Sequence, residues 1–421
     1  MNQERALKIA IVGINFTPEV SGIAPYTSGL ATGMADRGHH VRVLTTFPHY
    51  PQWRFQEGTP PRRSMETMSG VEVVRARHYV PEKPTGMRRA LSEVSFGSAV
   101  PPRRWGQPDV LVCVSPALLS SAMAFASARW GRASRPALGL IMQDLYSAGA
   151  SESDMAGGGA ARILARLEAW AVHQADGVVV IHDRFKSRIE REFSVPGDKV
   201  TVIRNWTHLP EVQPFDRTCF RTGMGWSPEE TVVLHTGAMG EKQGLSNVVA
   251  AARLAEHEGF PLRFVLVGDG GQRVALEAQA GDCANIEFLE PLPGDAYGMA
   301  MRSADILLVN ERPGLVEMAV PSKLTSYFSS GVPVLAATEP NSTTADELAA
   351  SGAGVRIGPG DPRALVTEAL RLGEDQAYAA LLGVKGPEYC ESMLSGKASL
   401  DSFEAWVRRL SVGRRTMVGV K

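Results

Sequence analysis

Short apolar runs that alternate with helical patterns constrain the fold of this 421-residue chain more than any other feature. Runs such as KIAIVGINF and DVLVCVS are continuously apolar rather than alternating, which indicates strands covered on both faces of a sheet. Strands that alternate with helices form parallel, doubly wound α/β sheets. The pattern restarts near residue 231 with TVVLHTG, so we expect two similar Rossmann-like domains in tandem.

A stretch containing Pro, Trp and Gly separates the two halves and is interpreted as a linker. The expected parts are a first domain over residues 1–205, the linker over 206–228, a second domain over 229–395 and a C-terminal helix over 396–421. This helix has an apolar face that can pack on either domain, and we predict packing on the first. Ligands of doubly wound domains bind beyond the carboxyl ends of the strands, so a central cleft is expected to hold the site.

The composition excludes several classes of protein. Lys and Arg number 44 against 45 Asp and Glu, so the chain lacks the global basic excess typical of nucleic-acid binding. Its four cysteines are far apart, which favours reduced structural thiols over a zinc site or a disulfide framework. The N-terminus is too polar for a signal peptide, and no apolar stretch reaches the ~20 residues that span a bilayer. We therefore expect a cytoplasmic protein.

The loop after the first strand, GINFTPEVSGIAPY, does not carry the G-x-G-x-x-G fingerprint of dinucleotide binding. This argues against NAD or FAD as a cofactor. Gly22 precedes the first helix, where it either leaves backbone N–H groups for an anionic ligand or only shapes a turn.

Two loops of the second half have the composition of phosphate-binding loops. In HTGAMGEKQGL, Lys242 lies just before a helix, and a point charge beside helix N–H groups suits a diphosphate. In FVLVGDGGQ, a strand runs into Gly268 and Gly270, which let a ligand approach the backbone closely. An ordinary surface lysine and a plain tight turn are the alternatives.

The segment VPSKLTSYFSSG begins another helix after a long loop. Ser322 can cap this helix, and Lys323 places a cation in its first turn. A cation there opposes the helix dipole unless an anion binds beside it. The segment therefore indicates a phosphate site, with a solvated lysine as the alternative.

Taken in order, these segments resemble the retaining glycosyltransferases of family 4, the glycogen-synthase-like enzymes with the GT-B fold. The phrases FPHYPQW, MQDLY, RNW, KQGL and VPSKLTSYFSSG are similar to the colanic-acid subset that builds exopolysaccharide. The resemblance implies two Rossmann-like domains that face a central cleft. It also implies transfer of a sugar from a UDP- or GDP-type donor to a glycan, lipid-linked or small-molecule acceptor, with no metal or other cofactor.

The resemblance places the donor in the second domain, with its diphosphate against the glycine loop and the lysines and its base flanked by the loop at residues 290–292. The donor-site positions that it implies are Gly22, Lys242, Gly268, Gly270, Glu290, Leu292, Ser322, Lys323 and Ser326.

Two departures from the family pattern bear on the chemistry. Where many relatives carry two glutamates spaced E-x7-E, this chain has Met318 and Ser326, with Glu317 one place before the first. Ala238 stands where relatives often have arginine, so the charge of the diphosphate rests on Lys242 and Lys323. No D-x-D sequence occurs in the chain, which also favours a reaction without metal.

The first domain is expected to bind the acceptor. Asp144, at a strand end in MQDLY, either contacts the reacting carbon or caps the following turn. His49 and Tyr50 in FPHYPQW either touch the acceptor or have a structural role. Together with Lys242 and Glu317 of the second domain, Asp144 completes the set of candidate catalytic residues.

Residues 84–105 combine arginines with large apolar side chains and predict either a peripheral contact with the inner face of the cell membrane or a solvated helix. The basic and large apolar residues of this segment are Met87, Arg88, Arg89, Leu91, Phe96, Arg103, Arg104 and Trp105.

Two functions other than sugar transfer remain open for this chain, a nucleotide-sugar epimerase of the same fold and a non-catalytic nucleotide-sugar binder.

Overall fold

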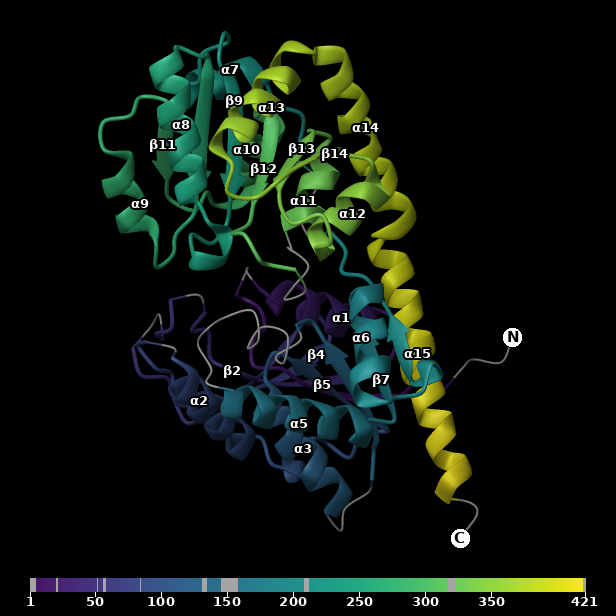
Figure 1. The fold of residues 1–421 in the computed structure, drawn as a ribbon. Coiled ribbons are helices and arrows are strands. Elements are labelled where there is room, and N and C mark those ends of the chain that lie inside the picture. Colours follow the sequence, from purple (N-terminus) through teal and green to yellow (C-terminus); the bar gives the residue numbers. More distant parts are fainter. Residues whose placement is uncertain are drawn as a thin grey trace. The chain divides into compact units, whose positions relative to one another are not determined.

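The computed structural model describes residues 5–418 except 20–21, 51, 56–57, 84, 131–134, 145–157, 208–211 and 317–322. The chain forms two compact units (Figure 1). The first consists of Met1–Asn205 together with Gly396–Lys421, and the second of Trp206–Ser395. In the described part of the chain, no helix is both long and apolar enough to cross a bilayer.

The first unit has an eight-stranded sheet in the order β3-β4-β2-β1-β5-β6-β7-β8. All neighbouring strands are parallel except β3 and β4, which are antiparallel. The strands are β1 (Lys8–Val12), β2 (His40–Thr46), β3 (Arg63–Met68), β4 (Val71–Ala76), β5 (Val110–Ser115), β6 (Ala137–Met142), β7 (Gly177–Val180) and β8 (Val200–Val202). The sequence did not predict β3, because this edge strand has mostly exposed side chains rather than an apolar run.

Helices cover this sheet in two groups (Figure 1). Helices α2, α3 and α5 pack side by side, and α1 packs with the C-terminal helix α15. The helices of the unit are α1 (Ala24–Asp36), α2 (Gly86–Ala99), α3 (Leu118–Trp130), α5 (Gly158–Gln174), α6 (Asp183–Phe193) and α15 (Gly396–Val418), with short 3-10 helices at Pro102–Arg104 and Gly197–Lys199.

Helix α15 is seated on the first sheet by one large side chain over two glycines. Trp406 is 1% exposed. A Cβ atom on Gly139 in β6 would lie 2.5 Å from the Trp406 ring, and one on Gly177 in β7 would lie 2.9 Å from it. The glycines therefore form the hollow that receives the indole, and the chain end belongs to the first unit.

The second unit has a six-stranded, fully parallel sheet in the order β11-β10-β9-β12-β13-β14. Its strands are β9 (Thr231–Thr236), β10 (Leu262–Val267), β11 (Ile286–Leu289), β12 (Ile306–Asn310), β13 (Val334–Ala337) and β14 (Gly354–Ile357). Its helices are α7 (Arg217–Gly223), α8 (Ser246–Glu258), α9 (Arg273–Ala280), α10 (Gly294–Ser303), α11 (Lys323–Ser330), α12 (Thr343–Ser351), α13 (Pro362–Glu374) and α14 (Gln376–Met393).

Apolar cores lie on both faces of this sheet. One core joins the strands to α8, α9 and α13, and the other joins them to α10, α11 and α14. The continuous apolar runs seen in the sequence are therefore strands that are buried on both sides, as a doubly wound sheet requires.

The expected linker over residues 206–228 is largely part of the second unit. Helix α7 begins within it, where the Asp216 carboxylate accepts a hydrogen bond from the Cys219 N–H at 3.0 Å. Trp226 is 2% exposed in the core that contains α10 and α11. Trp226 and helix α7 therefore pack as part of the second unit.

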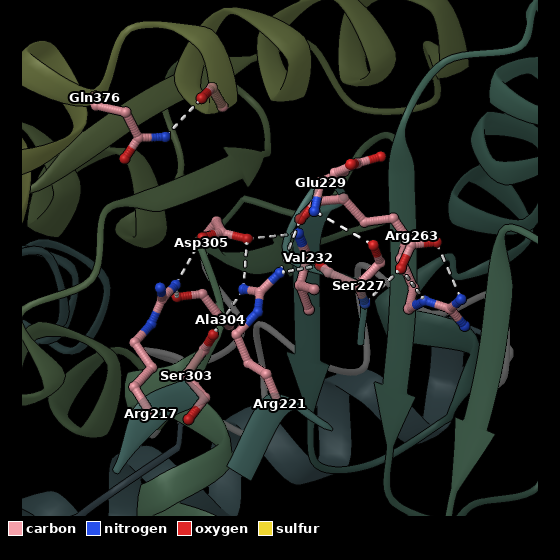
Figure 2. A network of polar contacts seen from close by, with 12 residues as sticks. Arg217, Arg221, Ser227, Glu229, Val232, Arg263, Ser303, Ala304, Asp305 and Gln376 are labelled. Carbon is pink, nitrogen blue, oxygen red and sulfur yellow. Dashed lines mark hydrogen bonds and ion pairs between the residues drawn. The ribbon is translucent and has the colours of Figure 1, made fainter. Parts of the chain in front are cut away.

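An ion-pair network fixes α7 to the sheet (Figure 2). The Asp305 carboxylate, just before β12, accepts from Arg217 at 2.7 Å and from Arg221 at 2.9 Å. It also accepts from the Val232 N–H of β9 at 2.8 Å. Arg221 is 6% exposed, and it donates to the carbonyls of Ser227 and Glu230 as well. One carboxylate thus joins a helix to two adjacent strands.

We expect Asp305→Ala to destabilise the second unit by about 3 kcal/mol, because the substitution leaves the buried Arg221 guanidinium without its carboxylate. Urea denaturation, followed as the unfolding transition of this unit, measures the effect. The control is Glu258→Ala, which breaks the exposed ion pair of Glu258 with Arg363 and should cost less than about 1 kcal/mol. Equal losses from the two substitutions would contradict this assignment.

Candidate functional site

The loops of the second unit meet at the carboxyl ends of β9, β10 and β12. The loop after β10 lies directly against the loop after β9. The Gly237 N–H donates to the Val267 carbonyl at 2.8 Å, and the Met239 N–H donates to the Asp269 carbonyl at 2.9 Å. These bonds between main-chain groups set the shape of the predicted phosphate-binding loops.

Glycines make this approach between the two loops sterically possible. A Cβ atom on Gly268, whose φ is +145°, would overlap the Gly237 carbonyl oxygen. One on Gly270 would lie 2.5 Å from the Met239 carbonyl oxygen. The sequence singled out Gly268 and Gly270 for approach by a ligand, and the structure shows that their neighbour is the adjacent loop.

The loop that carries Lys242 is anchored to the end of β12. The Asn310 side-chain amide donates to the carbonyls of Gln243 at 2.7 Å and Gly244 at 3.0 Å. The Arg312 N–H donates to the Lys242 carbonyl at 3.0 Å. The Lys242 backbone is therefore held while its side chain is exposed.

Lys323 lies at the start of α11 and reaches back to the end of β9. Its Nζ atom is 3.2 Å from Nε2 of His235, which is fully buried. The same atom is 3.8 Å from the position that a Cβ on Gly237 would occupy. Burial lowers the pKa of Lys323 to about 7, and the charge of Glu311 opposes this shift. Burial also lowers the pKa of His235 well below its ordinary value, with the Lys323 charge adding to the effect.

Glu311 is a buried carboxylate that sequence reasoning did not identify. It follows β12 directly, is 8% exposed, and accepts hydrogen bonds from the hydroxyls of Thr338 and Thr344. The sequence feature that could have identified Glu311 is its place as an acidic residue immediately after the predicted strand ADILLVN.

The other residues predicted to bind the sugar donor are spread around the carboxyl edge of the second sheet. Ser326 is 4% exposed within α11. Glu290 and Leu292 follow β11, where the exposed Glu290 carboxylate pairs with Arg273 at 2.9 Å and Leu292 packs on the core. Glu317 and Ser322 lie outside the described residues.

The first unit holds a second cluster at the carboxyl ends of β1 and β2. Gly22, at φ +64°, lies against the Tyr50 ring, since a Cβ there would be 3.3 Å from Cε1 of that ring. Glu19 is 7% exposed, and its carboxylate accepts from the N–H groups of His49 at 2.8 Å and Tyr50 at 2.9 Å. The sequence did not single out Glu19, although it is the group that joins the two predicted loops.

The two predicted acceptor residues differ in exposure. His49 is 2% exposed, and its ring contacts that of His78 with the centroids 4.7 Å apart. Burial lowers the pKa of His49 and lowers that of His78 to about 3, so both rings are neutral near pH 7. Tyr50 is only partly buried. Tyr50 is thus the member of this pair whose side chain reaches the surface.

Asp144 follows β6 and lies near Tyr50. Burial is the main cause that raises the pKa of Tyr50, and the charges of Asp144 and Glu19 add to it while that of Arg89 opposes it. The structure therefore brings Gly22, Tyr50 and Asp144 to one edge of the first sheet.

Arg75 is a buried cation of β4 that supports this edge. It is 5% exposed and donates to the Thr17 carbonyl at 2.6 Å and the Thr46 carbonyl at 3.1 Å. The sequence signal was a basic residue within the largely apolar run VEVVRA.

The described residues contain no group of three or more His, Cys, Asp or Glu side chains that could hold a metal ion. The four cysteines are free thiols, of which Cys219 is exposed and the other three are buried.

Two helix-covered, doubly wound sheets, parallel apart from the edge strand β3, are the architecture of the GT-B glycosyltransferases, and the comparisons agree with this. Residues 21–206 match the family described as Glycosyl transferase 4-like domain, and residues 230–375 match Glycosyl transferases group 1. The putative colanic acid biosynthesis glycosyl transferase WcaI of Escherichia coli (strain K12) is 31% identical over 342 residues, which cover 77% of this chain and 82% of WcaI.

Solved structures share the fold at low sequence identity. Sucrose-phosphate synthase from Thermosynechococcus elongatus has a TM-score of 0.74 at 17% identity, covering 96% of this chain and 99% of that one. Anabaena HepE in complex with UDP-glucose has a TM-score of 0.67 at 16% identity, covering 96% and 100%. The chain belongs to the family 4 glycosyltransferases with the GT-B fold.

We expect Gly268→Ala to destabilise the second unit by about 2 kcal/mol or more, since the new methyl group would meet a backbone oxygen at a strained φ. Gly271→Ala is the matched control, because a Cβ there meets nothing within 4 Å. Thermal unfolding of both variants checks this expectation. Equal melting temperatures would show that the two loops tolerate a wider separation.

Proposed function

We propose that the protein is a retaining, metal-independent glycosyltransferase that moves a sugar from a UDP- or GDP-type nucleoside-diphosphate sugar. The observation that carries this proposal is the convergence of Lys323 with the loops after β9 and β10 at one sheet edge. The exposed Lys242 on the anchored loop adds a second cation. Cations held at such an edge suit a diphosphate.

In the proposed reaction, the bond between the sugar anomeric carbon and the diphosphate oxygen breaks while a bond to the acceptor hydroxyl forms on the same face. The leaving phosphate oxygen takes the proton of that hydroxyl. Lys242 and Lys323 stabilise the negative charge that develops on the diphosphate. They would supply the charge that metal ions supply in enzymes with a D-x-D motif, which this chain lacks.

The acceptor is proposed to bind the first unit beside Tyr50 and Asp144. Asp144 is the candidate for a polar contact near the anomeric carbon, and Tyr50 offers a partly exposed ring to the acceptor. Likeness to WcaI supports a glycan or lipid-linked acceptor in the biosynthesis of an exopolysaccharide or another cell-surface glycan.

We expect one class among UDP-, GDP-, ADP- and dTDP-sugars to raise the melting temperature of the protein, with no effect of EDTA. A ligand at a hundred times its Kd stabilises the native protein by about 2.7 kcal/mol. Lys242→Ala should weaken that binding about tenfold through loss of a charge-assisted contact, and Lys186→Ala in α6 serves as the control. If no nucleotide sugar at millimolar concentration shifts the transition, the donor site is refuted.

Products separate transfer from the two alternatives. A transferase releases nucleoside diphosphate in proportion to a glycosylated acceptor, an epimerase changes the sugar without an acceptor, and a pure binder shows no turnover.

The exposed face of α2 supports a peripheral contact with an anionic membrane. Met87, Leu91 and Val94 are spaced along one face of the helix and are 80%, 54% and 39% exposed. Exposed cations lie nearby in sequence at Lys83, Arg88, Arg89 and Arg103. Apolar side chains flanked by cations suit a surface of anionic lipid. Phe96 and Trp105, which the sequence grouped with this patch, are buried and belong to the core.

We expect the protein to cosediment with phosphatidylglycerol vesicles and not with phosphatidylcholine vesicles. Arg88→Gln with Arg103→Gln should lower the partition coefficient roughly 30-fold, at about 1 kcal/mol for each cation. Met87→Glu with Leu91→Glu should abolish binding. Leu381→Glu with Val384→Glu, at similarly exposed positions of α14, is the control. Equal binding by all variants would contradict a contact through α2.

A further inference from the structure

We propose that the Lys323 ammonium supplies the positive charge at the turn after β9, where the resemblance to family 4 implies an arginine at position 238, and that a diphosphate binds it together with one proton from solvent. This inference rests on the proposed function and adds a property of the donor site, the linkage of donor binding to pH.

The position of Lys323 supports this assignment. Its Nζ atom comes from the start of α11 and lies beside the backbone of Gly237, the residue before Ala238. Ala238 itself carries no charge. A cation is thus present at this turn, although it comes from a different element of the fold.

The partner of Lys323 is a neutral ring. With its proton assigned to Nδ1, the His235 ring donates to the Leu308 carbonyl oxygen at 3.2 Å. The lone pair on Nε2 then accepts from Lys323 Nζ at 3.2 Å. The His235 ring is fully buried and its pKa is lowered, so it stays neutral. A neutral imidazole accepts a hydrogen bond but does not compensate the charge of an ammonium.

The other ionisable groups near Lys323 do not neutralise it by direct contact. Glu311, at the end of β12, favours the charged ammonium, but its carboxylate is hydrogen-bonded to two threonine hydroxyls. Tyr327 of α11 and Tyr297 of α10 place their hydroxyls on Thr236, and burial raises the pKa of both, so they remain neutral. Within the described ranges, the hydrogen-bond partners of Nζ are the His235 ring nitrogens alone.

A diphosphate would bring negative charge into direct contact with Nζ, which none of the described residues does. In the free protein the pKa of Lys323 is about 7 because of burial, and a bound anion would raise it. Binding is then strongest below pH 7, where the ammonium is already formed. Above pH 7 each bound diphosphate brings a proton with it, and affinity falls by up to about tenfold per pH unit until the pKa of the complex is reached.

Calorimetry of the full chain with pyrophosphate, UDP and GDP at pH 7, 8 and 9 tests the proposal. Titrations in HEPES and Tris, which differ in ionisation enthalpy, give the number of protons taken up. We expect uptake approaching one proton at pH 8 and an affinity loss of tenfold or more from pH 7 to 9. Lys323→Arg should bind without proton uptake and with a flatter pH profile, because guanidinium stays charged throughout.

Two further variants separate a binding role from a structural one. Lys186→Arg in α6, outside the donor site, should leave the proton uptake unchanged. Lys323→Met should lose diphosphate affinity at pH 7, while the free protein melts no lower than the parent because a partly buried ammonium has been removed. Binding by the parent without proton uptake would overturn this inference and leave the proposed function intact. Failure of all three ligands and of every nucleotide sugar to bind would overturn both.

Discussion

Strands that are buried on both faces concentrate polar chemistry at the ends of the strands, and the arrangement of this molecule depends on that constraint. Strand β12 is wholly buried through Asn310, and the next residue is the carboxylate Glu311. Strand β9 is likewise apolar until His235 and the glycine turn that follows. Because the strands are parallel, these ends lie at one edge of the sheet, so groups distant in sequence meet without any loop having to cross the domain.

The two units hold adjacent loops together at the strand ends by different interactions. In the second unit, loops approach through missing side chains, because Gly268 and Gly270 lie against main-chain atoms of the neighbouring loop. In the first unit, a charged side chain makes the connection, because the Glu19 carboxylate accepts from two consecutive N–H groups of the next loop. The first solution tolerates no added atom, whereas the second depends on a buried charge with its hydrogen bonds satisfied. Each leaves the neighbouring loop held before any ligand arrives.

The sequence was sufficient for the doubly wound architecture, since apolar runs and their spacing depend on local pattern alone. It failed where packing overrides composition. Helix α14 contains Pro387 and two glycines, so the sequence pattern did not predict a helix there. The glycines allow close contact with the backbone of α11 and of the turn after it. In the sites, Lys323 and Tyr50 followed from motifs. Glu311 and His78 did not, because their contacts come from distant parts of the chain: Glu311 accepts from Thr338, just after β13, and the His78 ring contacts that of His49.

The return of α15 to the first sheet has a consequence for biosynthesis. Trp406 fills a hollow over Gly139 and Gly177, and those residues emerge from the ribosome more than two hundred positions earlier. A nascent first unit therefore has its strands complete but an apolar hollow open while the whole second unit is being translated. Domains generally fold in order during synthesis, and exposed apolar surface favours misassembly. This chain departs from that order, because the unit that starts first is also the one that must be finished last.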